Sequence, residues 1–302
     1  MRKLLALIVA LIVIPAASAS AAELDEILER SQEATYSAEQ VISCTTPDGV
    51  RDAVVSLEQT GAGLHVSGEV EVSAGYGGWE VVREGAVVSS ASVKAAATGA
   101  EPIYRVDEGV AHPFLNRKAG LYKLYAGDVL RGEMIVDGAT GALLSVSTYN
   151  EDGTVYCERK FIEFDPTPQQ EMTETTEPDE GLEPGAPVTA FPESLGDFRR
   201  LDIYEDGEGL IFAYYSDGLF SFAVFQTPSI VALEDAAALT IEDSVYAMSY
   251  SPGQVTYSWG TTAGGMALVG DLPPDMHPEV LAGLAAPGSP GFLQRIWRNL
   301  FG

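Results

Sequence analysis

The residue types best suited to catalysis or metal binding are three histidines, and their spacing forms no known reactive group. His65, His112 and His277 are far apart, and none belongs to a His-Glu-x-x-His motif or to a close pair. A zinc site would have to be assembled from three distant segments. His65 lies on the polar side of an alternating stretch, so a solvent-exposed side chain is the simpler interpretation. We predict no catalytic and no metal-binding role for these histidines.

Motifs for nucleophilic, phosphate and nucleotide chemistry are also missing. The chain has no Gly-x-Ser-x-Gly elbow, no P-loop and no complete dinucleotide fingerprint. The stretch "DIYEDGEG" lacks the Asp-x-Asp-x-Asp-Gly spacing of a calcium loop, and a plain turn is the simpler interpretation. Carboxylates are so abundant that a pair for acid–base work stays open, although no particular pair stands out. We therefore expect a protein that is not an enzyme and that uses no cofactor.

The two cysteines, Cys44 and Cys157, are predicted to form a disulfide, because a lone pair in an oxidising compartment usually does. The bridge would close a loop of about 110 residues and contribute about 4–5 kcal/mol in the chain-entropy description. It would tie the first strand of one domain to the last. The alternative, a reactive thiol pair, lacks the Cys-x-x-Cys spacing and a neighbouring histidine.

The first 21 residues predict export from the cytoplasm. Arg2 and Lys3 precede an apolar run from Leu4 to Ile14, and small residues follow in the pattern of a cleavage site. The run is too short for a comfortable membrane-spanning helix, and no cysteine follows it that could carry a lipoprotein anchor. We expect a cleaved signal peptide over residues 1–21 and a periplasmic or otherwise extracytoplasmic mature protein.

Composition and charge limit the classes of partner. The chain has 302 residues, is 46% hydrophobic and carries a formal net charge of −27. The hydrophobic content is ample for a packed core, and the length suits one large domain or two smaller ones. A nucleic-acid backbone or an anionic lipid surface would repel such an acidic protein. The simplest role of the charge is solubility.

A first domain is predicted over residues 22–165, with one helix followed by an antiparallel meander. The stretch "AELDEILERSQ" places Leu24, Ile27 and Leu28 on one helical face. "LHVSGEVEV" alternates as a strand, and "WEVVREGAVVSS" is typical of a hairpin. Residues 120–164 predict four strands, with turns near residues 127–128, 138–141 and 150–153. A further helix is expected within residues 107–119.

A second domain is predicted beyond an acidic linker. Residues 165–187 contain seven acidic residues, five prolines and no Lys or Arg, so we place a linker at 166–190. The small domain that follows, residues 191–286, has three strands on either side of residue 235 and a short helix at "HPEVLAGLA". Asp217-Gly218 is a strong hairpin signal. The C-terminal tail, residues 287–302, ends in the amphipathic stretch "GFLQRIWRNLFG", which is suited to its own domain, a membrane surface or a partner helix.

The two halves together resemble the RseB/MucB family of extracytoplasmic regulators of sigma-E-type envelope stress responses. In the first domain the resemblance rests on "WEVVREGAVVSS" and on "GLYKLYAGDVLRGEMIVDGATGALLSVSTYNEDGTVYCERKFIEFDP". In the second it rests on "YYSDGLFSFAVFQTP" and "MALVGDLPPDM". The linker is longer and more acidic than expected of the family, and the cysteine pair and the terminal "GFLQRIWRNLFG" are not assigned to the family, which leaves the docking surface of the second domain open.

The resemblance implies a mainly β fold with a few helices, of the α+β class. The large domain would be a LolA/LppX-like unclosed antiparallel half-barrel with helices in its concave face, and the small domain a separate antiparallel sheet. It implies a regulator that binds a membrane anti-sigma factor, shields it from proteolysis, senses lipid or lipoprotein signals and so restrains an envelope-stress sigma factor. A periplasmic lipid or lipoprotein carrier is the alternative.

Site residues follow from the expected faces of the two sheets. For an apolar pocket that could accept an acyl chain we expect inward-facing positions of the first sheet, namely Leu64, Val66, Val70 and Val72. For contact with a protein partner we expect Phe220, Phe222 and Phe225 in the second domain and Ile296 and Trp297 in the tail. The tail is also a candidate for peripheral contact with a membrane.

Overall fold

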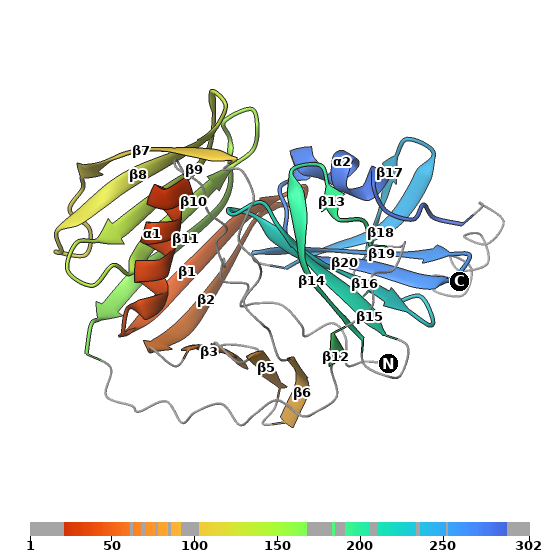
Figure 1. Cartoon of the computed structure of the whole chain (residues 1–302), viewed down its shortest axis with the longest axis horizontal. Helices are drawn as coiled ribbons and strands as arrows, with labels where there is room; N and C mark the ends of the chain where they lie inside the picture. The colour runs from red at the N-terminus through yellow and green to blue at the C-terminus, as the bar shows by residue number, and fades with distance from the viewer. Residues whose placement is uncertain are drawn as a thin grey trace. The chain divides into compact units, whose positions relative to one another are not determined.

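The computed structural model describes residues 21–60, 63–67, 71–75, 78–83, 86–91, 103–167, 183–184, 191–205, 210–233, 236–251 and 253–288. The chain forms two compact units, one with the described residues up to 167 and the other with those from 183 onward. Each unit is built on one open antiparallel sheet, and helices are few. The expected mainly β fold with two unclosed sheets is therefore confirmed (Figure 1).

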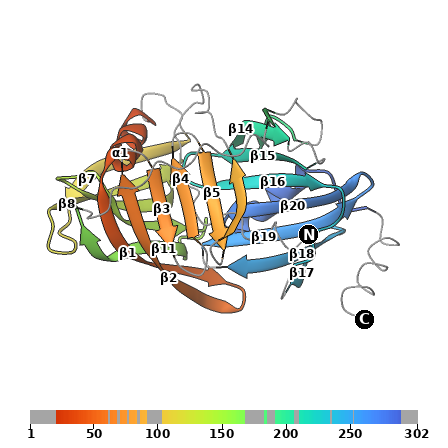
Figure 2. The same ribbon diagram turned by 90° about the horizontal axis from the view of Figure 1, so that it is seen from below.

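The first unit begins with helix α1, Ala21–Glu33, and continues in eleven strands. The strands are β1 Tyr36–Thr46, β2 Gly49–Thr60, β3 Gly63–Ser67, β4 Glu71–Gly75, β5 Gly78–Arg83, β6 Ala86–Ala91, β7 Tyr104–Ala111, β8 Ala119–Ala126, β9 Val129–Asp137, β10 Leu143–Tyr149 and β11 Val155–Asp165. Their order in the sheet is β6-β5-β4-β3-β2-β1-β11-β10-β9-β8-β7. The chain thus runs outward from β1 to one edge, starts again at the other edge and returns to β1, as Figure 2 shows for β1 to β5.

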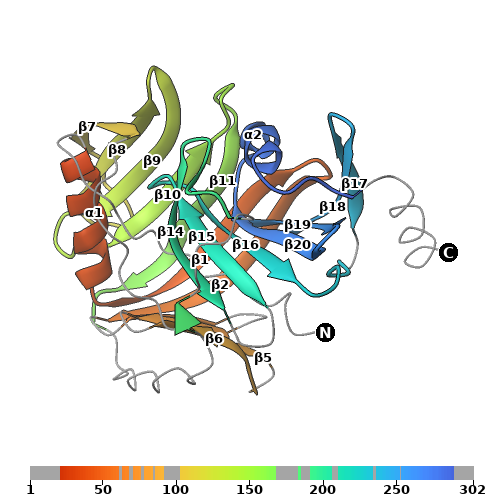
Figure 3. The same ribbon diagram turned by 45° about the vertical axis from the view of Figure 1, so that its right-hand side comes forward.

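Helix α1 packs on the face of the sheet that curves around it (Figure 3). Leu24, Ile27 and Leu28 are buried, as the helical spacing predicted. The sheet contributes buried apolar side chains to the same core, among them Ile42, Leu57, Val106, Leu124, Met134 and Phe161. Because successive strand residues alternate between faces, the opposite face carries the polar positions.

Two predictions for this unit are wrong. Residues 64–72 form no single strand, because β3 ends at Ser67 and β4 pairs back on it, with Val66 opposite Val72. Residues 107–119 form no helix, since β7 continues to Ala111 and a tight turn follows. Leu115 and Asn116 take positive φ angles of 48° and 59° in that turn, a conformation that suits a hairpin and not a helix. The turns expected at residues 127–128, 138–141 and 150–153 are present.

The second unit contains a nine-stranded sheet, and its central order is β14-β15-β16-β20-β19-β18-β17. The strands are β12 Glu183–Pro184, β13 Ser194–Leu195, β14 Phe198–Glu205, β15 Ile211–Ser216, β16 Ser221–Thr227, β17 Ala237–Ile241, β18 Ser244–Ser251, β19 Gln254–Thr261 and β20 Gly264–Asp271. The short helices η1, Pro274–Met276, and α2, His277–Ala282, follow. The three strands predicted on each side of residue 235 are confirmed, while β12, β13 and β17 were missed.

The geometry of the Asp217-Gly218 hairpin explains why the sequence predicted this turn. The Asp217 Oδ1 atom accepts hydrogen bonds from the backbone N–H groups of Leu219, at 2.9 Å, and Phe220, at 2.7 Å. Gly218 has φ 97°, which only glycine adopts at little cost. The Ser216 hydroxyl also donates to the Phe220 carbonyl oxygen at 3.0 Å. The turn therefore sets the register of β15 with β16, in which Ser216 lies opposite Ser221.

Candidate binding surfaces

The seam between β1 and β11 holds the two halves of the first sheet together. Cys44 and Cys157 are Cα partners in this seam, 4.1 Å apart, and form the predicted disulfide. Both cysteines are buried. The Thr148 hydroxyl of β10 donates to the Cys157 carbonyl oxygen at 3.2 Å, which joins the next strand to the same point. The covalent link therefore lies where the chain's first and last strands of this unit meet.

An aromatic cluster lies at the other end of the same seam, and it is formed by Tyr36, Phe161 and Phe164. The ring centroids of Tyr36 lie 5.4 Å from those of both phenylalanines, which stack on each other at 5.8 Å. The guanidinium carbon of Arg117 lies 4.8 Å from the centroid of the Phe164 ring. The cluster forms a rigid aromatic edge on the face of the first sheet that α1 covers, which is called the α1-bearing face below.

Arg117 connects this aromatic cluster to the turn between β9 and β10. Its guanidinium donates to both carboxylate oxygens of Asp137, at 2.7 Å and 2.9 Å. The backbone N–H and the hydroxyl of Thr140 both donate to the same carboxylate, at 2.8 Å each. Burial alone would raise the pKa of Asp137, but these hydrogen bonds outweigh it and lower the pKa to about 2. Asp137 is therefore a buried carboxylate that stays ionised.

The same turn holds the end of α1. Gly141 has φ 81°, and a Cβ atom placed there would lie 3.1 Å from the backbone oxygen and from the Cβ of Arg30 in α1. A side chain at this position would push the helix away from the sheet. The turn, Arg117 and the aromatic cluster therefore form one connected support that positions α1 on its face. Together with the buried apolar side chains, they form the face of the sheet on which α1 packs.

Three of the four predicted pocket residues belong to two neighbouring strands of this sheet. Leu64 and Val66 of β3 lie opposite Gln59 and Leu57 of β2, and both of these β2 residues are buried. Val72 belongs to β4, and Val70 lies outside the described residues, as do the side chains of the other three. Their role in a pocket stays a prediction.

The opposite face of the first sheet is polar along one row that crosses six strands. Lys123, Glu133, Ser147, Glu158, Ser43 and Asp52 follow one another as Cα partners from β8 to β2. Lys123 pairs with Glu133 at 2.9 Å, and the Tyr149 hydroxyl donates to Glu133 at the same distance. These groups are typical of a water-facing sheet surface, where such pairs add little stability.

Four exposed aliphatic side chains lie on this polar surface, and sequence reasoning missed them. They are Val50, Val54, Val155 and Ile162, which are 66%, 54%, 44% and 43% exposed. β1 lies between the two strands that carry them, and Val54 is the Cα partner of Val41. The polar row divides these four residues, because Asp52 lies between Val50 and Val54 on β2 and Glu158 lies between Val155 and Ile162 on β11. They therefore form no continuous apolar patch, and exposed aliphatic residues scattered in this way are ordinary. The only available signal was a set of valines in alternating strands, which is equally typical of a core.

In the second unit, the three phenylalanines expected to contact a partner lie in the core. Phe220 and Phe222 are 0% exposed and Phe225 is 1% exposed. The Phe222 ring packs between Tyr215, with centroids 5.3 Å apart, and Phe198, at 4.9 Å. Their burial gives no support to direct contact with a partner, which stays untested. Ile296 and Trp297 of the C-terminal tail lie outside the described residues.

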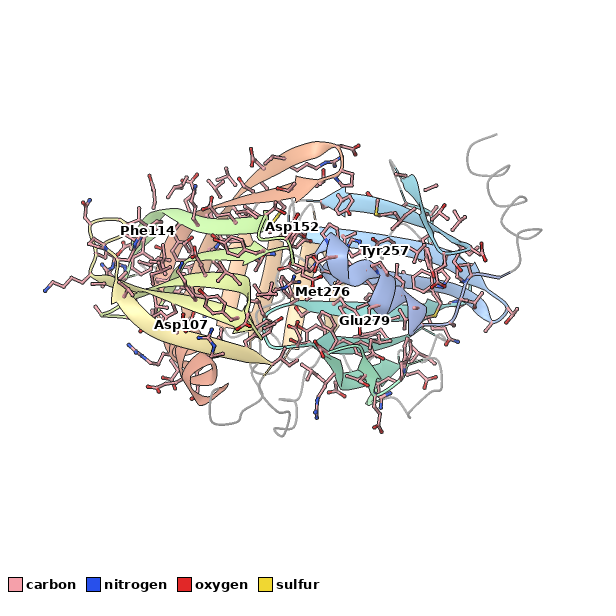
Figure 4. All side chains as sticks on the ribbon, turned by 90° about the horizontal axis from the view of Figure 1, so that it is seen from above. Asp107, Phe114, Asp152, Tyr257, Met276 and Glu279 are labelled. Atoms are coloured by element: carbon pink, nitrogen blue, oxygen red, sulfur yellow. A yellow bond between two sulfur atoms is a disulfide. The ribbon has the colours of Figure 1, made fainter. Side chains whose placement is uncertain are left out.

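A buried histidine–tyrosine pair connects α2 to the sheet. The Leu272 carbonyl oxygen, which can only accept, lies 2.8 Å from His277 Nε2, so this nitrogen carries the hydrogen. His277 Nδ1 therefore accepts from the Tyr257 hydroxyl at 2.5 Å. Figure 4 shows Tyr257 beside α2. Burial lowers the pKa of His277 to about 4, so the imidazole is neutral at pH 7.

Neither metal binding nor a membrane span is found among the described residues. No group of three or more His, Cys, Asp and Glu side chains in this part of the chain is arranged to hold a metal ion. His112 is exposed in the first unit and His277 is buried in the second. Neither helix of the described segments has the length and hydrophobicity needed to cross a membrane.

Comparison with known proteins identifies the fold. No protein-family profile matches the chain, and no curated protein sequence matches it. The complex structure of Pseudomonas aeruginosa MucA/MucB is similar, with a TM-score of 0.52 and 16% identity over 88% of this chain and 99% of that chain. A crystal structure of MucB matches with a TM-score of 0.50 and 14% identity, over 87% of this chain and 97% of that one. The chain therefore has a MucB-like fold, as the resemblance implied.

Proposed function

We propose that this chain is an extracytoplasmic regulatory protein that binds the exported segment of a membrane anti-sigma factor. The observation that carries the proposal is the MucB-like fold, which extends over 88% of this chain and 99% of a MucB chain solved with MucA. In this proposal the bound segment is shielded from proteolysis, and a lipid or lipoprotein signal relieves the shielding. The envelope-stress sigma factor is thereby restrained until the signal arrives.

The disulfide supports a location outside the cytoplasm. Structural disulfides persist in oxidising compartments and are rare where thiols are kept reduced. The Cys44–Cys157 bridge is buried in the central seam of a sheet, where it serves structure. The positively charged start and apolar run of residues 1–21 support export through a cleaved signal peptide.

The α1-bearing face supplies a physical means of sensing a lipid. The face is apolar and is filled by Leu24, Ile27 and Leu28 of α1. An acyl chain could replace these side chains, because each buried methylene contributes about 0.8 kcal/mol. Such a ligand changes the state of the protein only by its difference in affinity for the two states. The Arg117–Asp137 support would hold the rest of the face in place during this exchange.

The proposal is tested by affinity purification of the mature protein from its own cell envelope. We expect a membrane anti-sigma factor to co-purify, and we expect deletion of the gene to change envelope-stress transcription. A matched bait with Leu124→Asp, which disrupts the core of the first unit, controls for nonspecific capture. Absence of any anti-sigma factor together with unchanged transcription would reject the proposal.

A lipid or lipoprotein carrier is the second candidate, and the open sheet with one helix on its apolar face favours it. A carrier has no need of the second unit. Lipid extraction and mass spectrometry of the purified protein separate the two candidates. Stoichiometric lipid that is independent of a protein partner would favour the carrier.

A further inference from the structure

The segment that follows β20 packs on one face of the second sheet, and residues 273–288 are called the cover segment below. It contributes buried apolar side chains from α2 and from the residues just after it, namely Val280, Leu281 and Leu284. β19 contributes a row of buried side chains that share one face by strand alternation and are at most 2% exposed, namely Val255, Tyr257 and Trp259. The cover segment and this row of β19 belong to one apolar core.

Two side-chain hydrogen bonds attach the cover segment to β19. The Tyr257 hydroxyl donates to His277 Nδ1 at 2.5 Å, and the two rings meet edge to face with their centroids 5.2 Å apart. The Trp259 indole N–H donates to the Ala285 carbonyl oxygen at 2.8 Å. An indole and a carbonyl group do not titrate in water near neutral pH, whereas an imidazole does. Of these two attachments, the one at His277 is therefore the one that acid can change.

Protonation of His277 in its present position is unfavourable. The side chain is 3% exposed, its Nε2–H donates to the Leu272 carbonyl oxygen at 2.8 Å, and its Nδ1 is the acceptor for Tyr257. A proton on Nδ1 removes this acceptor and places a positive charge in a buried site. Such a charge costs free energy that it does not cost in water. Acid therefore favours any state in which this imidazole reaches water.

The ionisable groups around His277 oppose this effect only in part. Burial is the largest influence on the pKa of His277 and lowers it to about 4, whereas the Leu272 carbonyl oxygen and the exposed carboxylate of Asp275 act in the opposite direction. Burial raises the pKa of Tyr246, whose ring contacts Tyr257, so this phenol stays neutral. Three further carboxylates on or beside α2 and β13 are exposed, namely Glu193, Asp197 and Glu279.

The two remaining charged groups lie on neighbouring strands. Arg200 of β14 donates to the Phe191 carbonyl oxygen. Asp271 of β20 is three residues from Leu268, the Cα partner of Tyr257, so it lies on the opposite face of the sheet. Neither group therefore supplies a counter-charge that follows from these contacts.

We propose that the cover segment is an acid-responsive element, in which protonation of His277 releases residues 273–288 from the second sheet and exposes the row of Val255, Tyr257 and Trp259. The opening is local, and the strands of the sheet keep their hydrogen bonds. The exposed rings offer an aromatic surface to an apolar partner. The use of such a response rests on the proposed location outside the cytoplasm, but the response itself does not depend on an anti-sigma partner.

The size of the response follows from the two protonation equilibria. In the open state the imidazole takes its ordinary pKa of 6.5, and in the closed state the pKa is about 4. The ratio of open to closed protein therefore rises about twentyfold between pH 7 and pH 5. Above pH 7 the ratio is constant, because the imidazole is neutral in both states.

Hydrogen–deuterium exchange of the mature protein tests the proposal. The peptide that covers residues 281–288 includes the amide of Gly288, which donates to the Gly260 carbonyl oxygen of β19. After correction for the intrinsic exchange rate, its protection should fall about twentyfold between pH 7 and pH 5. Low concentrations of urea should change this protection little, because a local opening exposes little surface. Residues 222–225 of β16 should be better protected at both pH values and should lose protection as urea is added.

Two variants assign the effect to His277. His277→Phe keeps a ring but cannot take up a proton, so the pH dependence of residues 281–288 should disappear. His112→Phe changes an exposed histidine of the first unit and should leave it unchanged. NMR titration of the natural protein with isotope-labelled histidine needs no substitution and covers the case in which His277→Phe does not fold. The His277 ring should then titrate near pH 4.

Three results would overturn the proposal. The first is equal protection and equal urea dependence of residues 281–288 and 222–225 at pH 5, which indicates that the segment opens only when the whole unit unfolds. The second is a pH dependence of residues 281–288 that persists in folded His277→Phe, which assigns the effect to other groups. The third is titration of His277 at the ordinary value of 6.5, which shows that the closed state does not resist the proton.

Discussion

Cys44 and Cys157 face each other across β1 and β11, the pair of strands that closes the chain's path through the first sheet. The two cysteines are 113 positions apart in the sequence, and the residues between them include both outer runs of strands. A covalent link at this seam therefore restrains nearly the whole unit in its unfolded state, which is where a disulfide has most of its effect in the chain-entropy description.

Replacement of both cysteines, Cys44→Ala/Cys157→Ala, should lower the free energy of unfolding of the first unit by about 4–5 kcal/mol. Urea unfolding followed by far-UV circular dichroism measures the change. The transition of the second unit, which contains no cysteine, serves as the internal control. Equal stability of the variant and of the natural protein would contradict this account.

The substitution Asp137→Asn should destabilise the first unit by about 2–3 kcal/mol, because Arg117 and Thr140 lose the ionised acceptor that they share. We expect a smaller loss of unfolding free energy than for a fully buried ion pair, because the Arg117 side chain is 23% exposed. Asp128→Asn, which changes an exposed carboxylate in the β8–β9 turn, is the matched control. Both are measured by urea unfolding at pH 7.

The same carboxylate predicts acid sensitivity of the first unit. The pKa of Asp137 is lowered from 3.8 to about 2, so its contribution is fully present above pH 4 and is lost as the pH falls toward 2. Unfolding midpoints measured between pH 5 and pH 2 should fall less steeply in Asp137→Asn than in the natural protein. Parallel curves would show that the Arg117–Asp137 pair is not responsible.

His277 predicts a separate acid effect in the second unit, at higher pH. Its folded-state pKa of about 4 lies below the ordinary value of 6.5. As the pH falls, this histidine therefore takes up a proton in the unfolded chain before it does so in the folded protein. The free energy of unfolding of the second unit is unaffected by this histidine above pH 6.5 and decreases by about 3 kcal/mol as the pH falls to 4. His277→Phe should remove this slope, whereas His112→Phe, which changes an exposed histidine of the first unit, should keep it. Trp259 fluorescence follows the unfolding.

Substitutions at Phe222 distinguish a role of this side chain in the core from a role in binding a partner. Because its side chain is fully buried, Phe222→Ala should destabilise the second unit by about 3–5 kcal/mol. The milder Phe222→Leu should fold and should retain whatever partner the purification identifies. Loss of the partner from folded Phe222→Leu, with circular dichroism and unfolding close to those of the natural protein, would instead support direct contact by this ring.

Local patterns predicted most of the strands because the chemistry of each turn lies within a few residues. The Asp217-Gly218 hairpin and the turns of the β8–β11 meander belong to this group. The helix expected within residues 107–119 was wrong because the decisive feature is a pair of positive φ angles at Leu115 and Asn116. Asparagine tolerates this conformation well, but a leucine does not signal it. The run 64–72 was misassigned because its alternation persists through a chain reversal.

The candidate surfaces were less predictable, since burial depends on what packs above each strand. An alternating strand indicates two faces but does not say which of them α1 covers. Phe220, Phe222 and Phe225 therefore looked equally suited to a core and to a partner, and their burial was decided by neighbours such as Phe198 and Tyr215. The exposure of Val50, Val54, Val155 and Ile162 likewise depends on which face of the sheet each side chain occupies.

By itself, the sequence determined the mainly β class, the likeness to the MucB fold, the cysteine pair and most of the turns. These features depend on residue types, on short spacings and on the order of segments along the chain. Only the tertiary structure decided that Arg117 and Asp137 support α1, that His277 donates to Leu272 and accepts from Tyr257, and that Phe220, Phe222 and Phe225 are buried. Each of these features depends on contacts between segments that are distant in the sequence. Strand alternation and turn chemistry, which act over a few residues, do not predict such contacts.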